Sequence, residues 1–175
     1  PLQHVNNEVL KLMNRRMTRE KIESTLTDIK MRIPEATIRT QFIVGYPGET
    51  EAHFQELLKF VEKMRFDRVG CFMYSQEENT KAGGLPNQVD QETKQRRHDA
   101  LMELQQEISR DKHKQFIGKK LQVLVEGVSE ETELLLQGRH SQQAPDIDGV
   151  TYINEGTAKP GDMVEVEITD AMDYD

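Results

Sequence analysis

One segment of the chain, residues 38–74, limits the possible folds more than any other. Ile38–Val44 is mostly apolar and β-branched and runs directly into Gly45–Gly48, which predicts a strand ended by a tight turn. A helical pattern that Thr50 can cap follows, and then a second apolar run, Val69–Tyr74. Strand, helix and strand in this order predict two parallel neighbours in one sheet, joined by a right-handed crossover.

Two amphipathic helices are predicted ahead of this segment. Apolar residues recur at intervals of three and four in Val9–Met13 and again in Ile22–Ile33. Thr18 is a suitable N-cap for the second helix, and Pro34 stops it, because proline lacks the N–H that a helix interior needs. The chain therefore opens with two helices.

A loop and a long helix are predicted after the second strand. Residues 75–89 are polar and show no periodicity, whereas Asp90 can cap a charged helix that runs to about Phe116. Residues 1–117 thus supply about two strands of a sheet, and unpaired strand edges invite association. We expect this region by itself to be less stable than the region that follows it.

The pattern changes at Gly118 to short β runs punctuated by glycine, which predicts a small all-β barrel over residues 118–175. The predicted strands are Leu121–Val125, Leu134–Gln137, Val150–Ile153 and Val164–Ile168. Two domains are therefore expected: an α/β domain, residues 1–117, and a β-barrel domain, residues 118–175.

Charge divides at the same position. The 175 residues carry 23 Lys and Arg against 31 Asp and Glu, a net charge of −8. Residues 118–175 hold 4 of the basic and 13 of the acidic side chains, a net charge of −9, which leaves 19 and 18, a net charge of +1, for residues 1–117. No apolar run approaches the roughly 18 residues of a membrane span. The N-terminal residues lack a signal-peptide pattern, so we expect a cytoplasmic protein of which an upstream part is missing.

The chain has one cysteine, Cys71. A single thiol excludes an internal disulfide and a cysteine-rich metal site built from this chain alone. Cys71 lies in an apolar run without an adjacent basic residue, so we expect a buried, unreactive thiol. His4 belongs to no ligand cluster, and His53, His98 and His113 lie on charged helices, where we expect them to be exposed.

Several short motifs resemble the second half of the radical-SAM methylthiotransferases, and their order and spacing together are specific. They are Pro1–His4, Leu12–Arg16, Arg39–Glu51 and Phe72–Ser75. The closing β-barrel resembles a TRAM domain. Gly138–Arg139 and Ala144–Val150 extend the match and are most similar to the RimO branch of the family. The resemblance covers essentially the whole chain.

The resemblance implies a fold, an activity and cofactors. The fold is the C-terminal part of an open radical-SAM (β/α) barrel, followed by a small all-β TRAM barrel. RimO-type enzymes methylthiolate the β-carbon of an aspartate in a small-subunit ribosomal protein, S-twelve, by radical chemistry with S-adenosylmethionine and two 4Fe-4S clusters. The cysteines that hold both clusters in the family are absent here, so the chain alone is expected to be inactive.

The resemblance also implies site residues. It places Gln3, Arg39, Gly45, Tyr46, Pro47 and Tyr74 in the cofactor pocket, and Arg139, Asp146 and Asp148 at the substrate. No catalytic acid or base and no metal ligand is expected in this chain. Two alternatives stay open from the residues themselves: Gly45 and Gly48 are also what a strand-to-helix turn needs. Arg39, expected inside a buried strand, would pair equally well with an internal Asp or Glu.

The acidic β-barrel favours a protein substrate. Nucleic-acid binding relies on Lys and Arg that displace counterions, so a net charge of −9 disfavours direct tRNA binding and suits a basic ribosomal protein. A local basic patch around Lys119, Lys120 and Arg139 leaves RNA contact open. The related MiaB-type modification of a tRNA adenosine, and a stand-alone binding module, are the alternative functions.

Overall fold

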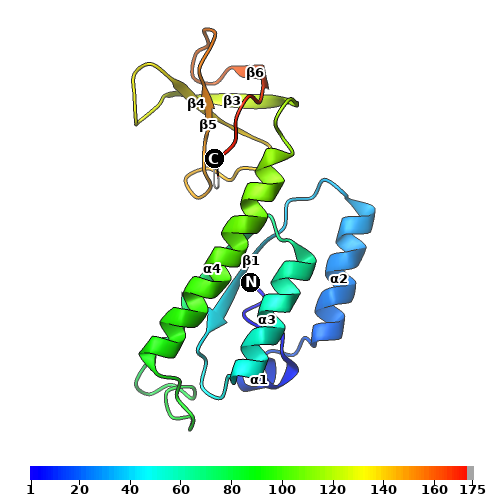
Figure 1. Ribbon diagram of the computed structural model, residues 1–175, viewed down its shortest axis with the longest axis vertical. Coiled ribbons are helices and arrows are strands. Elements are labelled where there is room, and N and C mark those ends of the chain that lie inside the picture. The colour runs from blue at the N-terminus through cyan, green and yellow to red at the C-terminus, as the bar shows by residue number, and fades with distance from the viewer. Residues whose placement is uncertain (173–175) are drawn as a thin grey trace. The chain divides into compact units, whose positions relative to one another are not determined.

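The computed structural model describes residues 1–172, and the chain divides into two compact units, Pro1–Ile108 and the residues from Ser109 onward (Figure 1). The helices and strands are α1 Asn7–Leu12, α2 Arg19–Arg32, β1 Arg39–Val44, α3 Glu51–Met64, β2 Arg68–Met73, α4 Gln91–Lys114, β3 Lys120–Val128, β4 Leu136–His140, β5 Thr151–Ile153 and β6 Met163–Glu167. The expected mixture of α/β and all-β regions is confirmed. A domain boundary between residues 117 and 118 stays a prediction.

The helices of the first unit begin at the residues that the sequence indicates. Thr18 Oγ1 accepts from the Lys21 N–H at 3.4 Å and caps α2. Thr50 caps α3 in a capping box with His53, in which each residue's side chain accepts from the other's backbone N–H. These caps satisfy backbone donors that the first helical turn leaves free.

Strands β1 and β2 are parallel and in register, from Arg39 opposite Arg68 to Val44 opposite Met73. The crossover between the two parallel strands is made by α3, as the strand-helix-strand pattern predicts. Gln3 extends the sheet on the other side of β1 as a parallel bridge to Phe42, with Gln3 N–H donating to Gln41 O at 2.9 Å. The short segment before α1 therefore lies along β1.

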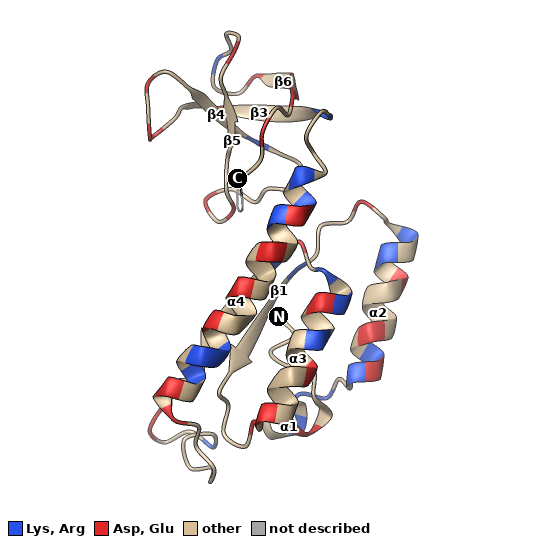
Figure 2. Cartoon of the chain, viewed as in Figure 1, with Lys and Arg blue, Asp and Glu red and all other residues tan. Residues whose placement is uncertain are grey.

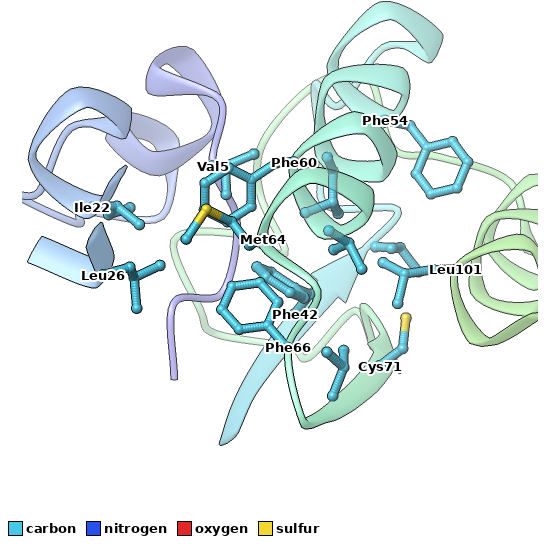
Figure 3. Close-up of a cluster of buried hydrophobic side chains, with 14 of the residues drawn as sticks. Val5, Ile22, Leu26, Phe42, Phe54, Phe60, Met64, Phe66, Cys71 and Leu101 are labelled. Carbon is cyan, nitrogen blue, oxygen red and sulfur yellow. The ribbon is translucent and has the colours of Figure 1, made fainter. Parts of the chain in front are cut away.

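One face of β1 and β2 is covered by helices, and the core of the first unit lies there (Figure 3). Phe42 on β1 lies beneath Phe60 and Met64 of α3, with α2 contributing Ile22 and Leu26. The rings of Phe42 and Phe66 meet edge to face with centroids 6.1 Å apart, an arrangement that aromatic pairs favour. Burial alternates along β1, because successive side chains of a strand point to opposite faces.

The second unit is an antiparallel four-stranded sheet with the order β5-β4-β3-β6. A bulge between Val125 and Gly127 shifts the register of β3 against β4 and adds local twist. Gly138 sits at a close approach, since a Cβ there would overlap with the Leu124 carbonyl. Three of the four predicted strands coincide with β3, β5 and β6 to within three residues, whereas β4, Leu136–His140, shares only two residues with the predicted Leu134–Gln137. The curled sheet agrees with a small barrel-like domain.

Candidate functional site

The turn Gly45–Gly48 joins β1 to α3 at the C-terminal end of the sheet. Gly45 has a φ of +72°, a left-handed conformation that favours glycine, and a Cβ at this position would overlap with Cγ of Lys94 from α4. Gly48 N–H donates to Asn87 O at 3.0 Å, which ties the turn to the loop before α4. Glycine at position 45 is therefore required both by the turn and by the neighbouring helix.

A buried carboxylate, Glu49, holds this turn. Its Oε2 accepts from the Gly45 N–H and, at 3.1 Å, from Arg97 Nη1, which also donates to the Glu49 carbonyl at 3.1 Å. The Glu49 side chain is fully buried and that of Arg97 is 5% exposed. The guanidinium also lies over the Phe54 ring, 5.7 Å from its centroid. The Glu49 carboxylate accepts from both the turn and Arg97, which offsets part of the desolvation cost of the pair, whereas Arg97 Nε is buried without a hydrogen-bond partner among the described residues.

His4 is the second buried partner of Glu49. The Nδ1 atom of His4 accepts from the Asn6 N–H at 3.0 Å, so this ring nitrogen carries no proton. The ring proton is therefore assigned to Nε2, which lies 3.3 Å from Glu49 Oε1. The segment beside β1, the turn and α4 are thus joined through one carboxylate. These contacts give the end of the sheet a rigid framework.

An aromatic pair lies at the same end of the sheet. Tyr46 and Tyr74 meet edge to face with ring centroids 5.1 Å apart, and the Lys94 ammonium lies 5.2 Å from the centroid of the Tyr74 ring. Tyr46 OH donates to Leu12 O at 3.3 Å. Burial and the neighbouring Tyr74 raise the pKa of Tyr46, so the Tyr46 phenol stays neutral at physiological pH.

The structure brings most of the predicted cofactor residues to this end. Tyr46 and Pro47 are buried in the turn, Tyr74 follows β2, and Gln3 pairs with β1 at its own left-handed φ of 70°. The expectation of a buried Arg39 is wrong. Arg39 is the first residue of β1, at the opposite end of the strand from the turn, and its side chain is exposed. The strand alternates, so Arg39 and Gln41 share the face that the helices leave uncovered.

The predicted substrate residues lie in the second unit. Arg139 on β4 pairs with Glu126 of β3, and Asp148 Oδ2 accepts from the Ala144 N–H at 2.7 Å, so Asp148 closes a loop turn. Asp146 is exposed in the same loop with a φ of 60°. Lys120 pairs with Glu165 at 3.3 Å. Two of the three basic side chains of the expected patch, Lys120 and Arg139, are thus paired with carboxylates, whereas the Lys119 ammonium lies 5.5 Å from the centroid of the Phe116 ring.

A cavity of about 680 Å³ lies in the second unit, with β5 and β6 among its walls. Its lining combines apolar side chains such as Leu121 and Val166 with a set of carboxylates. The acidic residues of this lining are Glu155, Glu165, Glu167 and Asp170. Residues 118–175 carry 13 acidic and 4 basic side chains, whereas Figure 2 shows both signs mixed on the helices of the first unit.

The expectations for cysteine and histidine have different outcomes. Cys71 is buried, and burial raises the pKa of its thiol to about 12, so an unreactive thiol is confirmed. His113 is buried, contrary to the expected exposure, because its Nδ1 lies 3.0 Å from the Met172 carbonyl and its ring meets that of Phe116. Within the described residues, no three His, Cys, Asp or Glu side chains gather as a metal site would require.

Sequence reasoning missed the three polar residues that organise the turn: Glu49, Lys94 and Arg97. One signal for two of them was available. Lys94 and Arg97 precede Leu101 by seven and four positions and therefore fall on the buried stripe of α4, where charged residues are rare unless they have a partner.

Comparisons with known proteins place the chain in a family. Residues 1–61 match the radical SAM superfamily and residues 117–175 match the TRAM domain. The chain is similar over all 175 residues to ribosomal protein uS12 methylthiotransferases RimO, with 67% identity for Bdellovibrio bacteriovorus, 51% for Pelobacter propionicus and 49% for Geobacter sulfurreducens. It spans 38%, 39% and 39% of those proteins. Among the described residues, no helix has the length and apolar character to cross a membrane.

Proposed function

Because the chain belongs to the radical-SAM methylthiotransferase family, we propose that its protein transfers a methylthio group to the β-carbon of an aspartate in ribosomal protein uS12. The observation that supports the proposal is the similarity of all 175 residues to RimO enzymes, whose name states ribosomal protein uS12 as the substrate. Acting on a ribosomal protein also places the enzyme in the cytoplasm.

The turn at the end of β1 suits S-adenosylmethionine. Gly45–Gly48 brings backbone close to any ligand there, while Tyr46 and Tyr74 supply aromatic surface and a hydroxyl that lacks a partner. We assign Gln3, Tyr46, Pro47 and Tyr74 to the cofactor pocket. The cofactor, when bound, supplies the radical and the methyl group for the reaction. This chain's residues hold and orient it and keep water out.

The iron-sulfur clusters do not fit this chain. Cluster iron is held by several thiolates, whereas the single thiol, Cys71, is buried with a pKa of about 12 and has no second cysteine beside it. Cysteines outside the 175 residues would hold two 4Fe-4S clusters in the whole enzyme. The chain alone is then inactive.

The second unit is suited to gripping a basic protein. The cavity of the second unit has four carboxylate side chains and no Lys or Arg in its lining, and residues 118–175 carry a net charge of −9. A basic protein is attracted to such a surface and a polyphosphate is repelled. Arg139, Asp146 and Asp148 lie in this unit and are proposed to contact the substrate.

The activity is tested with the full-length, cluster-loaded enzyme and isolated uS12. Mass spectrometry of the uS12 peptides is expected to show one methylthio group on an aspartate. Modification of tRNA adenosine instead of uS12 would overturn the proposal in favour of the MiaB-type reaction. Binding without any modification would favour a binding module.

The role of the acidic surface is tested by charge reversal. Changing Glu165, Glu167 and Asp170 to Lys in the full-length enzyme is expected to weaken uS12 binding and its salt dependence. A matched control changes Glu130, Glu131 and Glu133 to Lys, which alters net charge equally but away from the cavity lining. Equal binding by both variants and the unmodified enzyme would contradict substrate binding at the cavity.

A further inference from the structure

Lys94, in the first turn of α4, is a largely buried residue whose ammonium keeps some contact with solvent and has no anionic partner among the described residues. It keeps 7% of its surface exposed, and its ammonium has the Tyr74 ring as its neighbour. Among the residues that the structure describes, none places a carboxylate or another acceptor within bonding distance of this ammonium. Buried charges in proteins are normally paired, so this one calls for an explanation.

The Tyr74 ring stabilises the ammonium only in part. A cation over an aromatic ring gains about 0.5 to 2 kcal/mol, whereas desolvating an ion costs several kcal/mol even after relaxation. Arg97, three residues along the same helix, shows how this protein treats a buried cation when the partner is internal: it gives Arg97 a carboxylate, Glu49, at 3.1 Å. Lys94 lacks such a group.

Tyr74 adds a second, independent observation. Its hydroxyl is buried, and no hydrogen-bond partner for it exists among the described residues. Leaving a buried donor unsatisfied costs about 1 to 3 kcal/mol. Two neighbouring side chains, Lys94 and Tyr74, therefore each carry a donor without a hydrogen-bond acceptor.

Their place in the fold points to a ligand. Tyr74 follows the C-terminal end of β2, and the Lys94 stem packs against Gly45 at the C-terminal end of β1. Ligands of parallel α/β sheets bind at this end. One positive charge with one neutral donor matches a carboxylate, with one negative charge and two oxygens, better than a phosphate, which binds multiple cationic donors.

We propose that Lys94 and Tyr74 form a carboxylate-binding site at the C-terminal end of the β1-β2 sheet. The ammonium supplies the charge and the hydroxyl supplies the second donor. The proposal rests on the proposed function, under which two ligands bring a carboxylate to this end: the methionyl group of S-adenosylmethionine and the side chain of the substrate aspartate.

The test measures binding by the full-length, cluster-loaded enzyme in equilibrium dialysis. Lys94→Met is expected to weaken S-adenosylmethionine binding about 10- to 100-fold, the effect of losing a charged hydrogen bond. Binding of 5′-methylthioadenosine, which lacks the carboxylate, is expected to stay unchanged. Lys94→Arg keeps the positive charge and is the matched control. Its affinity for S-adenosylmethionine is expected to fall by at most about fivefold. Tyr74→Phe is expected to lower the affinity for S-adenosylmethionine about fivefold and to leave the affinity for 5′-methylthioadenosine unchanged.

A second arm identifies the source of the carboxylate. If Lys94→Met leaves S-adenosylmethionine binding intact but weakens binding of uS12, the carboxylate is that of the substrate. The unmodified enzyme must then prefer uS12 to a uS12 variant with asparagine at the target aspartate, and the Lys94→Met enzyme must lose that preference.

Three outcomes overturn the site. Equal weakening of S-adenosylmethionine and 5′-methylthioadenosine would assign Lys94 a packing role, and thermal melting then shows whether the variant is misfolded. Unchanged binding of all ligands in both Lys94→Met and Tyr74→Phe removes the site while the proposed function stands. If the unmodified enzyme binds neither S-adenosylmethionine nor uS12, the proposed function and the site fail together.

Discussion

The two units of the chain differ in how much apolar surface they bury. Eighteen apolar side chains are buried in residues 1–108, whereas from residue 109 to the last described residue only Val123 and Val125 are. Helices cover one face of β1 and β2, whereas β5 of the second unit is half-buried throughout and β6 alternates between exposed and half-buried side chains. Burial is the main stabilising contribution to folding.

This difference argues against the expectation that the first unit is the weaker one. That expectation considered only the unpaired edges of the strands. It left out the apolar side chains of the helices, which are buried against the two strands. The distribution of charge also indicates that the second unit is the less stable one. A net charge of +1 over residues 1–117 produces little self-repulsion, whereas a net charge of −9 on the remaining 58 residues produces more. Four substitutions test the comparison, from the largest expected effect to the smallest.

Phe60→Ala should be the most damaging change. Phe60 is fully buried on α3, and its ring centroid lies 5.8 Å from that of Phe66. Removing the ring leaves a cavity, so the free energy of unfolding of the first unit should fall by about 3 to 5 kcal/mol, measured by hydrogen exchange in the full-length protein. Met31→Ala on the exposed side of α2 is the control, with a change within about 0.5 kcal/mol. A loss below about 1 kcal/mol for Phe60→Ala would break the comparison.

Glu49→Gln should cost nearly as much without removing any volume. The substitution leaves the Arg97 guanidinium buried with only Glu51, 3.6 Å away, as an anionic partner. Breaking a buried pair in this way should lower the stability of the first unit by about 3 kcal/mol. Glu56→Gln is the matched control, because Glu56 pairs with Arg19 in a half-exposed position and should lose less than about 1 kcal/mol. Equal effects would show that burial of the pair is unimportant.

Val125→Ala probes the smaller core of the second unit. Val125 is 1% exposed on β3, and losing two methyl groups there should lower stability by about 2 kcal/mol. Val128→Ala on the same strand is about half-exposed and should change stability by less than about 1 kcal/mol. Hydrogen exchange of β3 amides gives both values. If Val125→Ala matched Phe60→Ala, the second unit would have a core as essential as that of the first.

Glu51→Gln should have the smallest effect, visible in acid. Hydrogen bonding from Arg96, at 2.7 Å, lowers the pKa of Glu51 from 4.5 to about 2. A carboxyl with a lowered pKa contributes stability above pH 4.5, and the contribution is lost as pH falls from 4.5 to 2. The side chain is half-exposed, so the variant should lose less than about 1 kcal/mol at pH 7, and this deficit should shrink steadily as pH falls from 4.5 through 2. A deficit of constant size over that range would exclude this pair as its cause.

Much of the fold follows from local signals in the sequence. Thr18, Thr50 and Asp90 cap helices as predicted, since capping depends on residues three positions apart. The parallel pairing of β1 and β2 follows from the strand-helix-strand order. The family motifs also bring Tyr46, Pro47 and Tyr74 to one end of the sheet.

The organisation of the candidate site could not be predicted in the same way. His4 and Glu49 are 45 positions apart, and Glu49 and Arg97 are 48 apart, so no local pattern links them. Arg39 was misplaced because its neighbours are apolar, although alternation along a strand puts every second side chain on the opposite face. Charged residues on the buried stripe of α4 were the one signal that pointed to the site.

The overlap between Gly45 and Lys94 has a consequence for how this protein can change. Gly45→Ala meets Cγ of Lys94 as well as an unfavourable φ, so the substitution should be poorly tolerated while Lys94 is present. Shortening Lys94 to Ala first removes the overlapping Cγ and thus most of the steric part of that cost. The two substitutions are then non-additive, and their order decides whether an intermediate folds. Positions 45 and 94, far apart in the chain, are expected to vary together or not at all.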